Sequence, residues 1–236
     1  MTTLDKLKVR VRQYLNHGSA ERVALKSVLD ALVSGLPETV IFGGMLREFA
    51  LGNARDFTSD IDLVTLESRQ EIYRVIAPFS PIENKFGGFR FVVAKRRFDI
   101  WAFDDTWAFR EGIVRGSGFG DLLRTTFFNL DAAALHLGRK ELFWTESYKL
   151  GIEKRVLEIN LVENPFPERM VRRAIRMALE KDLAIGANLA AFILAHARPD
   201  DLDWESQLFF EGLENHVHTR GDRSYTFAPQ KSVLAQ

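Results

Sequence analysis

The sequence predicts an α/β (α+β) fold, in which helices flank a mixed β-sheet and a short helical domain follows. Short apolar runs typical of strands occur at residues 40–42, 60–64, 89–94 and 98–103. Segments with apolar residues three or four positions apart precede and separate these runs, and that spacing is the helical period. From Pro167 onward the chain becomes helical and basic. We therefore expect one α/β domain over residues 1–162, which includes N-terminal helices, and a helical domain over 163–236.

The composition limits the classes of function. Lys and Arg number 32, as do Asp and Glu, so the net charge is zero and any contact with nucleic acid has to use a local basic patch. The absence of cysteine excludes disulfides and thiolate metal sites and is typical of a reducing compartment. The apolar stretch 185–197 is too short to span a bilayer. We expect a cytoplasmic protein with no membrane partner.

The remaining elements follow from spacing and from turn residues. We expect helices at 4–15, from Ser19 to Gly35, at 68–77 behind a Ser68 cap, at 122–137, at 184–196 and at 204–215. The strands 89–94 and 98–103 form a hairpin around the polar residues 95–97. Residues 112–121 are rich in glycine and predict a loop. Phe143, Trp144, Tyr148 and Leu150 are candidates to continue the sheet.

A glycine pair joins the first strand to a short helical segment. The run 40–42 leads into Gly43 and Gly44, and an amphipathic stretch follows. Glycine lets the backbone approach an anion closely, and a helix start offers unpaired N–H groups to a phosphate. Arg47 is placed either to contact that phosphate or to pair with Glu48 or Asp56. The alternative is a tight strand-to-helix turn without a ligand.

Asp60 and Asp62 stand two residues apart on a strand, so both carboxylates point to one face while Ile61 and Leu63 point to the core. Two adjacent carboxylates repel each other unless a cation lies between them. Oxygen ligands suit magnesium, and two such ions activate a hydroxyl and stabilise a leaving pyrophosphate. A solvated edge strand is the alternative for an isolated pair of this kind. The preceding glycine turn favours the metal site.

Asp99 is a third candidate acid. It interrupts the apolar strand 98–103, where a charge is costly without a partner. A metal ion or the proton of a substrate hydroxyl would supply that partner. Pairing with an arginine such as Arg97 is the alternative.

The stretches GGMLREFALG and SDIDLV together resemble the head domain of the polymerase-β-like nucleotidyltransferases. Within them the chain is most similar to the branch of poly(A) polymerases and CCA-adding tRNA nucleotidyltransferases. The resemblance implies transfer of a nucleotide from a nucleoside triphosphate such as ATP with two Mg²⁺ ions. It implies Asp60 and Asp62 as metal ligands and Asp99 as a possible third. The residues that carry it are Gly43, Gly44, Arg47, Leu51, Gly52, Asp60 and Asp62.

Two weaker similarities follow downstream. Residues 125–132 resemble the family's Phe-Thr-x-Asn-Ala segment, with Asp131 at the position of the asparagine. Residues 173–176 resemble the Arg-Ala-x-Arg helix of its neck domain, which implies that Arg173 and Arg176 approach the nucleotide or the RNA backbone. A solvated helix face is an equal alternative for these arginines. Residues 163–167 do not match the family's Glu-Asp-x-x-Arg element.

These observations predict a magnesium-dependent nucleotidyltransferase that uses a nucleoside triphosphate, releases pyrophosphate and acts on a hydroxyl acceptor. An RNA 3′ end is the favoured acceptor, on the resemblance alone. A small molecule or a protein side chain is the alternative acceptor. A catalytically silent module that binds nucleotide or a protein partner is the rival class, and the presence of all three acids argues against it. The oligomeric state is open.

Overall fold

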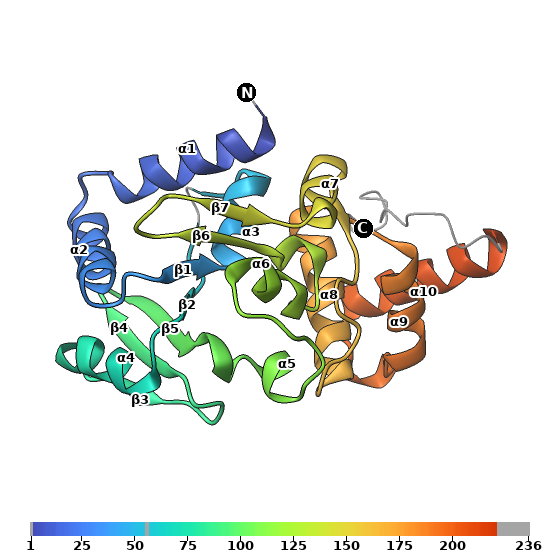
Figure 1. Ribbon diagram of the computed structural model, residues 1–236. Coiled ribbons are helices and arrows are strands. Elements are labelled where there is room, and N and C mark those ends of the chain that lie inside the picture. The colour runs from blue at the N-terminus through green and yellow to red at the C-terminus, as the bar shows by residue number, and fades with distance from the viewer. Residues whose placement is uncertain (1, 55–56, 221–236) are drawn as a thin grey trace. The chain divides into compact units, whose positions relative to one another are not determined.

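The computed structural model describes residues 2–54 and 57–220 (Figure 1). The chain divides into two compact units, Met1–Thr126 with Leu130–Lys149, and Phe127–Asn129 with Leu150–Gln236. The sequence places the start of the helical domain at residue 163, whereas the second unit also includes residues 127–129 and 150–162. Backbone hydrogen bonds hold these segments together, from Asn129 N to Glu158 O and from Asn160 N to Phe127 O.

The first unit contains a seven-stranded sheet in the order β3-β4-β5-β2-β1-β6-β7. Its strands are β1 (Thr39–Phe42), β2 (Ile61–Thr65), β3 (Ile82–Glu83), β4 (Phe89–Val93), β5 (Arg96–Ala102), β6 (Ala133–His136) and β7 (Leu142–Trp144). Its helices are α1 (Thr3–Leu15), α2 (Ala20–Gly35), α3 (Gly44–Leu51), α4 (Arg69–Ile76), α5 (Trp107–Arg110) and α6 (Phe119–Leu122), and α7 (Glu146–Lys154) begins in it. The pair β2–β5 is parallel and the other neighbours are antiparallel, so the predicted mixed sheet with flanking helices is confirmed.

The register of the strands gives the sheet two different faces. One row of paired residues crosses all seven strands, and because paired residues point to the same face it forms part of one surface. The row runs Ile82, Arg90, Asp99, Asp62, Phe42, Ala134, Phe143. The neighbours of its central members, Ile41, Leu63 and Ile100, point to the opposite face and are fully buried. The hydrophobic core therefore lies on the face away from the aspartates.

The helix limits follow local signals in the sequence. Ser68 caps α4 as predicted, since its hydroxyl accepts a hydrogen bond from Glu71 N while the Glu71 carboxylate accepts one from Ser68 N. Thr2 and Asp5 form the same reciprocal cap at α1. Because these caps satisfy backbone donors that a helix leaves open, both helices begin where the sequence indicates.

The helix expected over residues 122–137 is wrong. The chain there forms the end of α6, the short 3₁₀ segments Leu123–Thr125 and Asn129–Asp131, and strand β6. All four residues of β6 are buried, and the strand pairs with β1 on one side and β7 on the other. The preference of alanine for helix is at most about 0.7 kcal/mol per residue over most others, and the unpaired backbone groups of β1 outweigh it. After β6, Phe143 and Trp144 continue the sheet in β7, whereas Tyr148 and Leu150 lie in α7.

The second unit is mostly helical, as predicted for residues after 166. It contains β8 (Val156–Leu157), α8 (Pro167–Lys181), β9 (Ala184–Ile185), α9 (Ala187–His196) and α10 (Trp204–Arg220). The parallel pair β8–β9 ties the segment after α7 to the start of α9. The Glu158 carboxylate accepts hydrogen bonds from Leu189 N at 2.8 Å and Asn188 N at 3.1 Å, which satisfies the first turn of α9.

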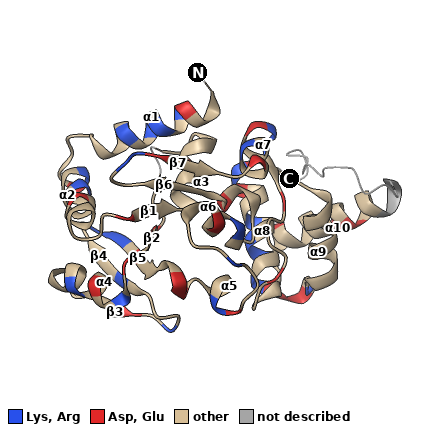
Figure 2. Ribbon diagram, viewed as in Figure 1, with Lys and Arg blue, Asp and Glu red and all other residues tan. Residues whose placement is uncertain are grey.

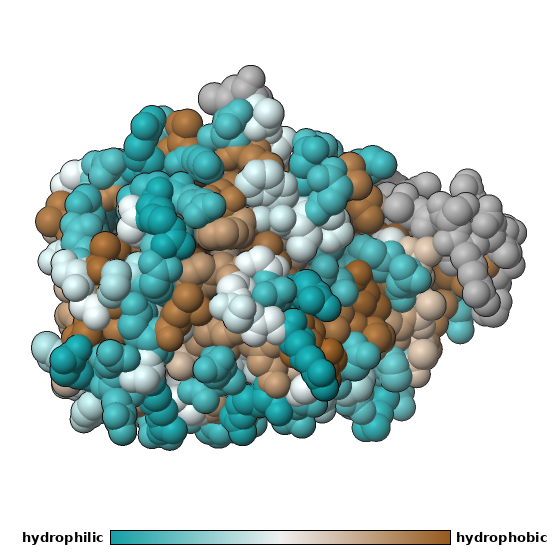
Figure 3. Space-filling model, in the orientation of Figure 1, coloured by the Kyte–Doolittle hydropathy of each residue, from teal (hydrophilic) through white to brown (hydrophobic). Residues whose placement is uncertain are grey.

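The surface seen in Figure 3 mixes hydrophilic residues with exposed apolar ones. Among the most exposed large apolar side chains are Ile82 and Trp204. Within the described residues, no helix combines the length and the apolar character that crossing a bilayer requires.

Lowering the pH should destabilise the first unit partly through Glu38. The Glu38 carboxylate accepts a hydrogen bond from Arg139 Nη1 at 2.6 Å and lies 3.4 Å from His136 Nε2. The hydrogen bond from Arg139 lowers the pKa of Glu38. A lowered pKa stabilises the fold above the ordinary glutamate value of about 4.3, and that stability is lost as the pH falls through the folded-state pKa.

We therefore expect the free energy of unfolding of the Glu38→Gln variant to fall less between neutral and acidic pH than that of the natural protein. The difference should be at most about 1 kcal/mol, because solvent screens this partly exposed carboxylate. Urea denaturation at both pH values measures it. An identical pH dependence in the two proteins would contradict the assignment.

Candidate active site

Asp62 lies in β2, and Asp60 lies one residue before this strand. Ile61 and Leu63 are completely buried, while Asp60 and Asp62 are both partly accessible. The prediction that the two carboxylates leave the strand on the face opposite the core is therefore confirmed.

Asp99 lies directly beside Asp62 in the parallel register of β2 and β5. It is buried, and Arg90 stands opposite it on β4. Arg90 Nε and Nη2 each donate to one Asp99 carboxylate oxygen at 2.8 Å. The sequence suggests Arg97 as the alternative ion-pair partner of Asp99, whereas in the structure this partner is Arg90.

Arg97 pairs instead with Asp60, at 3.2 Å between Nη1 and Oδ2, and both side chains are partly exposed. The hydrogen bonds to Asp99 raise the pKa of Arg90, and the nearby charges of Asp99, Asp60 and Asp62 raise it further. All three carboxylates thus lie within electrostatic reach of one guanidinium. Within residues 2–54 and 57–220, no three acidic or histidine side chains converge on a point as the ligands of one metal ion would.

The glycine turn meets this surface at Asp62. Gly43 precedes α3 with a φ of 64° and a ψ of −115°, and its N–H donates to Ala133 O. A Cβ placed on Gly44 would lie 3.6 Å from Arg47 Nη2 and 4.0 Å from Asp62 Oδ2. The bare backbone of the turn therefore stands next to an acid of β2 and a guanidinium of α3.

Replacing Gly43 with alanine should destabilise the turn. A backbone with a φ of 64° and a ψ of −115° costs an L-residue about 1–3 kcal/mol, whereas glycine adopts it freely. We expect the free energy of unfolding in urea to fall by that amount. Gly18→Ala is the matched control, because Gly18 has open space around it and no positive φ. An equal effect of the two substitutions would contradict this explanation.

Arg47 is buried in α3 at 7% exposure. Its Nη1 donates to Asp131 Oδ1, and its Nε and Nη2 lie 3.3 Å from Glu48 Oε1. Burial alone lowers the pKa of Arg47, but the charges of Asp131 and Glu48 outweigh burial and raise it. Of the partners considered from the sequence, Glu48 is present, and Asp56 lies outside the described residues.

Three further groups support the site, and the sequence did not identify their roles. Arg90 binds Asp99, and Asp131 binds Arg47. The hydroxyl of Tyr148 donates to Leu46 O at 3.2 Å inside α3, and burial raises its pKa. Tyr148 and Asp131 are each far from α3 in the sequence, so no local pattern indicates these contacts.

Arg173 and Arg176 lie in the second unit on α8. Their side chains are exposed, as are those of Arg169 and Arg172 on the same helix, whereas Met170, Ala174, Met177 and Ala178 are buried. Figure 2 shows basic residues along α8. The guanidinium carbon of Arg173 lies 5.6 Å from the centre of the Phe128 ring. The helix is amphipathic as predicted, and a role of Arg173 and Arg176 in nucleotide binding stays a prediction.

No protein-family model and no curated protein matches the sequence. Solved structures do match the fold. A Thermotoga maritima CCA-adding enzyme complexed with tRNA matches with a TM-score of 0.58 at 18% identity, over 88% of this chain and 54% of that chain. A tRNA nucleotidyltransferase complexed with a primer tRNA and an incoming ATP analogue matches with 0.55 at 16% identity, over 81% and 60%. A CCA-adding enzyme complexed with ATP matches with 0.53 at 18% identity, over 81% and 43%.

The chain thus spans about half the length of these enzymes. At such low identity the likeness concerns the fold. The chain therefore has a fold similar to that of the CCA-adding tRNA nucleotidyltransferases, which is the fold that the resemblance implies.

Proposed function

We propose that the chain is a magnesium-dependent nucleotidyltransferase that moves a nucleotide from a nucleoside triphosphate to a hydroxyl group and releases pyrophosphate. One observation carries the proposal. Asp62 stands beside Asp99 on one sheet face, and the glycine turn before α3 approaches the Asp62 carboxylate. A group of acids next to a bare backbone turn is the arrangement that metal-bound phosphates require.

The donor atoms of these three acids are carboxylate oxygens, which are the ligands that magnesium prefers. Asp60 and Asp62 would hold the ions, with Asp99 as a third acid. Bound magnesium supplies positive charge to the phosphates and lowers the pKa of the attacking hydroxyl. Metal binding at Asp60 would break its ion pair with Arg97. The cost is small, because an exposed ion pair of this kind contributes only about 0–1 kcal/mol.

Asp99 would accept the proton of the acceptor hydroxyl. The two hydrogen bonds from Arg90 fix the orientation of this carboxylate relative to Asp62. Both partners are fixed in turn by the paired strands β4 and β5. Arg90 therefore acts as a positioning residue in this proposal.

The backbone of Gly43 and Gly44 and the start of α3 would bind the phosphates. Arg47 would contribute through Nη2, the guanidinium atom closest to Gly44. Because two buried carboxylates already neutralise this guanidinium, its larger effect is to fix the turn. Arg173 and Arg176 on α8 would contact the nucleotide or the RNA backbone, as the resemblance implies.

We propose an RNA 3′ end as the acceptor and the cytoplasm as the location. The complexes of similar fold with tRNA and with ATP support RNA and a nucleoside triphosphate as ligands. The exposed arginines of α8 supply a local basic surface on a chain of zero net charge. A small molecule or a protein hydroxyl is the alternative acceptor.

A catalytically silent nucleotide-binding or protein-interaction module is the second candidate. The pairing of Asp60 with Arg97 and of Asp99 with Arg90 favours it, since these ion pairs satisfy acids that a catalyst would offer to metal. The first candidate function requires transfer of a nucleotide to an acceptor, whereas the second requires binding alone.

Incubation with each labelled nucleoside triphosphate, magnesium and total cellular RNA distinguishes them. Label that enters RNA and depends on magnesium supports the proposal, and ribonuclease digestion verifies the acceptor. Label in a small-molecule or protein fraction would support nucleotidyl transfer but with an acceptor other than RNA. A thermal shift with nucleotide and magnesium but without transfer to any fraction supports the silent module.

A further inference from the structure

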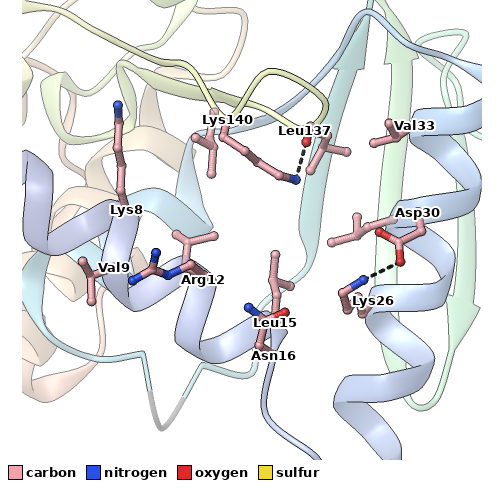
Figure 4. Close-up of a pocket in the computed structure, with 13 residues that line it drawn as sticks. Lys8, Val9, Arg12, Leu15, Asn16, Lys26, Asp30, Val33, Leu137 and Lys140 are labelled. Carbon is pink, nitrogen blue, oxygen red and sulfur yellow. Dashed lines mark hydrogen bonds and ion pairs between the residues drawn. The ribbon is translucent and has the colours of Figure 1, made fainter.

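A cavity lies on the core face of the sheet, away from the aspartates. It has a volume of about 480 Å³ and lies in the first unit between α1, α2 and the end of β6 (Figure 4). Leu135 lines it and pairs with Ile41, which pairs with Leu63 on the face opposite Asp62. Its volume lies within the range of about 300–1,000 Å³ that is typical of small-molecule sites.

The walls of this cavity are apolar. Val11 from α1, Leu29 from α2 and Leu137 after β6 are buried, and Leu15 and Val33 are partly exposed at its edge. These side chains come from α1, α2 and the segment after β6, so three separate elements form the walls.

Cationic side chains surround the apolar walls. Lys8, Arg12, Lys26 and Lys140 line the cavity, and Asp30 is the one acid among its lining residues. The whole chain has no net charge, so this excess of positive charge is local. Figure 4 shows Lys26 reaching in from α2, where it pairs with Asp30 at 2.6 Å, and Lys140 reaching in from the turn after β6. Lys140 donates one hydrogen bond to Leu137 O, and an ammonium group has three donors.

We propose that this cavity binds a small organic anion with an apolar body, namely a carboxylic acid with an alkyl chain. The leucine and valine side chains cover the alkyl chain, and the ammonium of Lys140 with its cationic neighbours binds the carboxylate. The local charge excess selects an acid over the corresponding alcohol. This site is independent of the proposed nucleotidyl transfer.

Calorimetric titration of the full chain with hexanoate, decanoate and decanol tests the proposal. We expect decanoate to bind more tightly than hexanoate, by up to about fourfold for each additional buried methylene. Decanol should bind about tenfold more weakly than decanoate, because it carries no charge for Lys140. Equal binding of decanol and decanoate, or binding of neither, would overturn the proposal.

Variants of the chain locate the site. Val33→Trp fills the cavity and should abolish binding, and Lys140→Glu should weaken binding about tenfold. Lys6→Glu is the matched control, because Lys6 is an exposed lysine of α1 outside the cavity lining. Binding that survives Val33→Trp would refute this location.

A measurement on the natural protein keeps the test decisive if a variant does not fold. A fatty acid that carries a photoreactive diazirine should label peptides from α1 and α2, and decanoate should compete with it. Labelling confined to other peptides would overturn the proposal.

Discussion

Replacing Asp62 with asparagine should lower nucleotidyl transfer by more than about a hundredfold. Residues that only orient a metal ligand already account for about 10- to 100-fold, and Asp62 would be a ligand itself. Its carboxylate also lies beside the glycine turn, where the phosphates of the substrate would bind. The rate of label transfer to the acceptor, at saturating magnesium and nucleoside triphosphate, measures the effect.

Asp60→Asn should show a loss of the same kind, whereas Asp104→Asn should not. Asp104 is an exposed aspartate of the same unit that lies outside the proposed site, so it controls for the loss of one surface charge. Urea denaturation of each variant separates a loss of chemistry from a loss of folding. Transfer that persists at the natural rate in both Asp60→Asn and Asp62→Asn would exclude this site as the catalytic centre.

The alternation along β2 could be predicted from the sequence, because it depends on the period of a single strand. Ile61 and Leu63 are apolar and Asp60 and Asp62 are not, so the core face is evident once the strand is recognised. Ser68 is similarly local, since the cap and its glutamate lie three residues apart. These features need no knowledge of distant segments.

Which arginine pairs with Asp99 depends on the turn between β4 and β5. The polar residues 95–97 suggest a connection of three residues, but the actual turn consists of Ala94 and Lys95, both with positive φ. A two-residue turn with positive φ at both positions sets a definite hairpin register. That register places Arg90 opposite Asp99, while the alternation along β5 puts Arg97 on the same sheet face as Asp99. Ala94 carries no signal for such a turn, so the sequence missed this pairing.

The segment 122–137 could not be assigned from local preference. Its alanines favour helix, yet β1 lacks a partner on one side until β6 joins it. The position of Asp131 next to Arg47 follows from that strand pairing, because Asp131 lies only two residues before the start of β6. A buried ion pair 84 residues apart in sequence cannot be seen without the topology.

Arg47→Met should lower the free energy of unfolding by about 3–5 kcal/mol. The substitution keeps an extended apolar side chain but leaves Asp131 and Glu48, both buried, without their shared cation. Breaking a buried ion pair by removal of one partner has this magnitude, because an uncompensated charge remains inside the protein. Urea denaturation followed by circular dichroism measures it.

A double-mutant cycle separates the charge interaction between Arg47 and Asp131 from the packing of the Arg47 side chain. Because Asp131→Asn removes a charge that no longer faces Arg47 in the Arg47→Met variant, the double variant should cost less than the two single variants added together, by about 0.5–3 kcal/mol. Lys149→Met is the matched control: its exposed pair with Glu146 should contribute only about 0–1 kcal/mol. Strictly additive costs would mean that Arg47 stabilises α3 by packing alone. A large coupling would show that the charge interaction between Arg47 and Asp131 itself stabilises the fold.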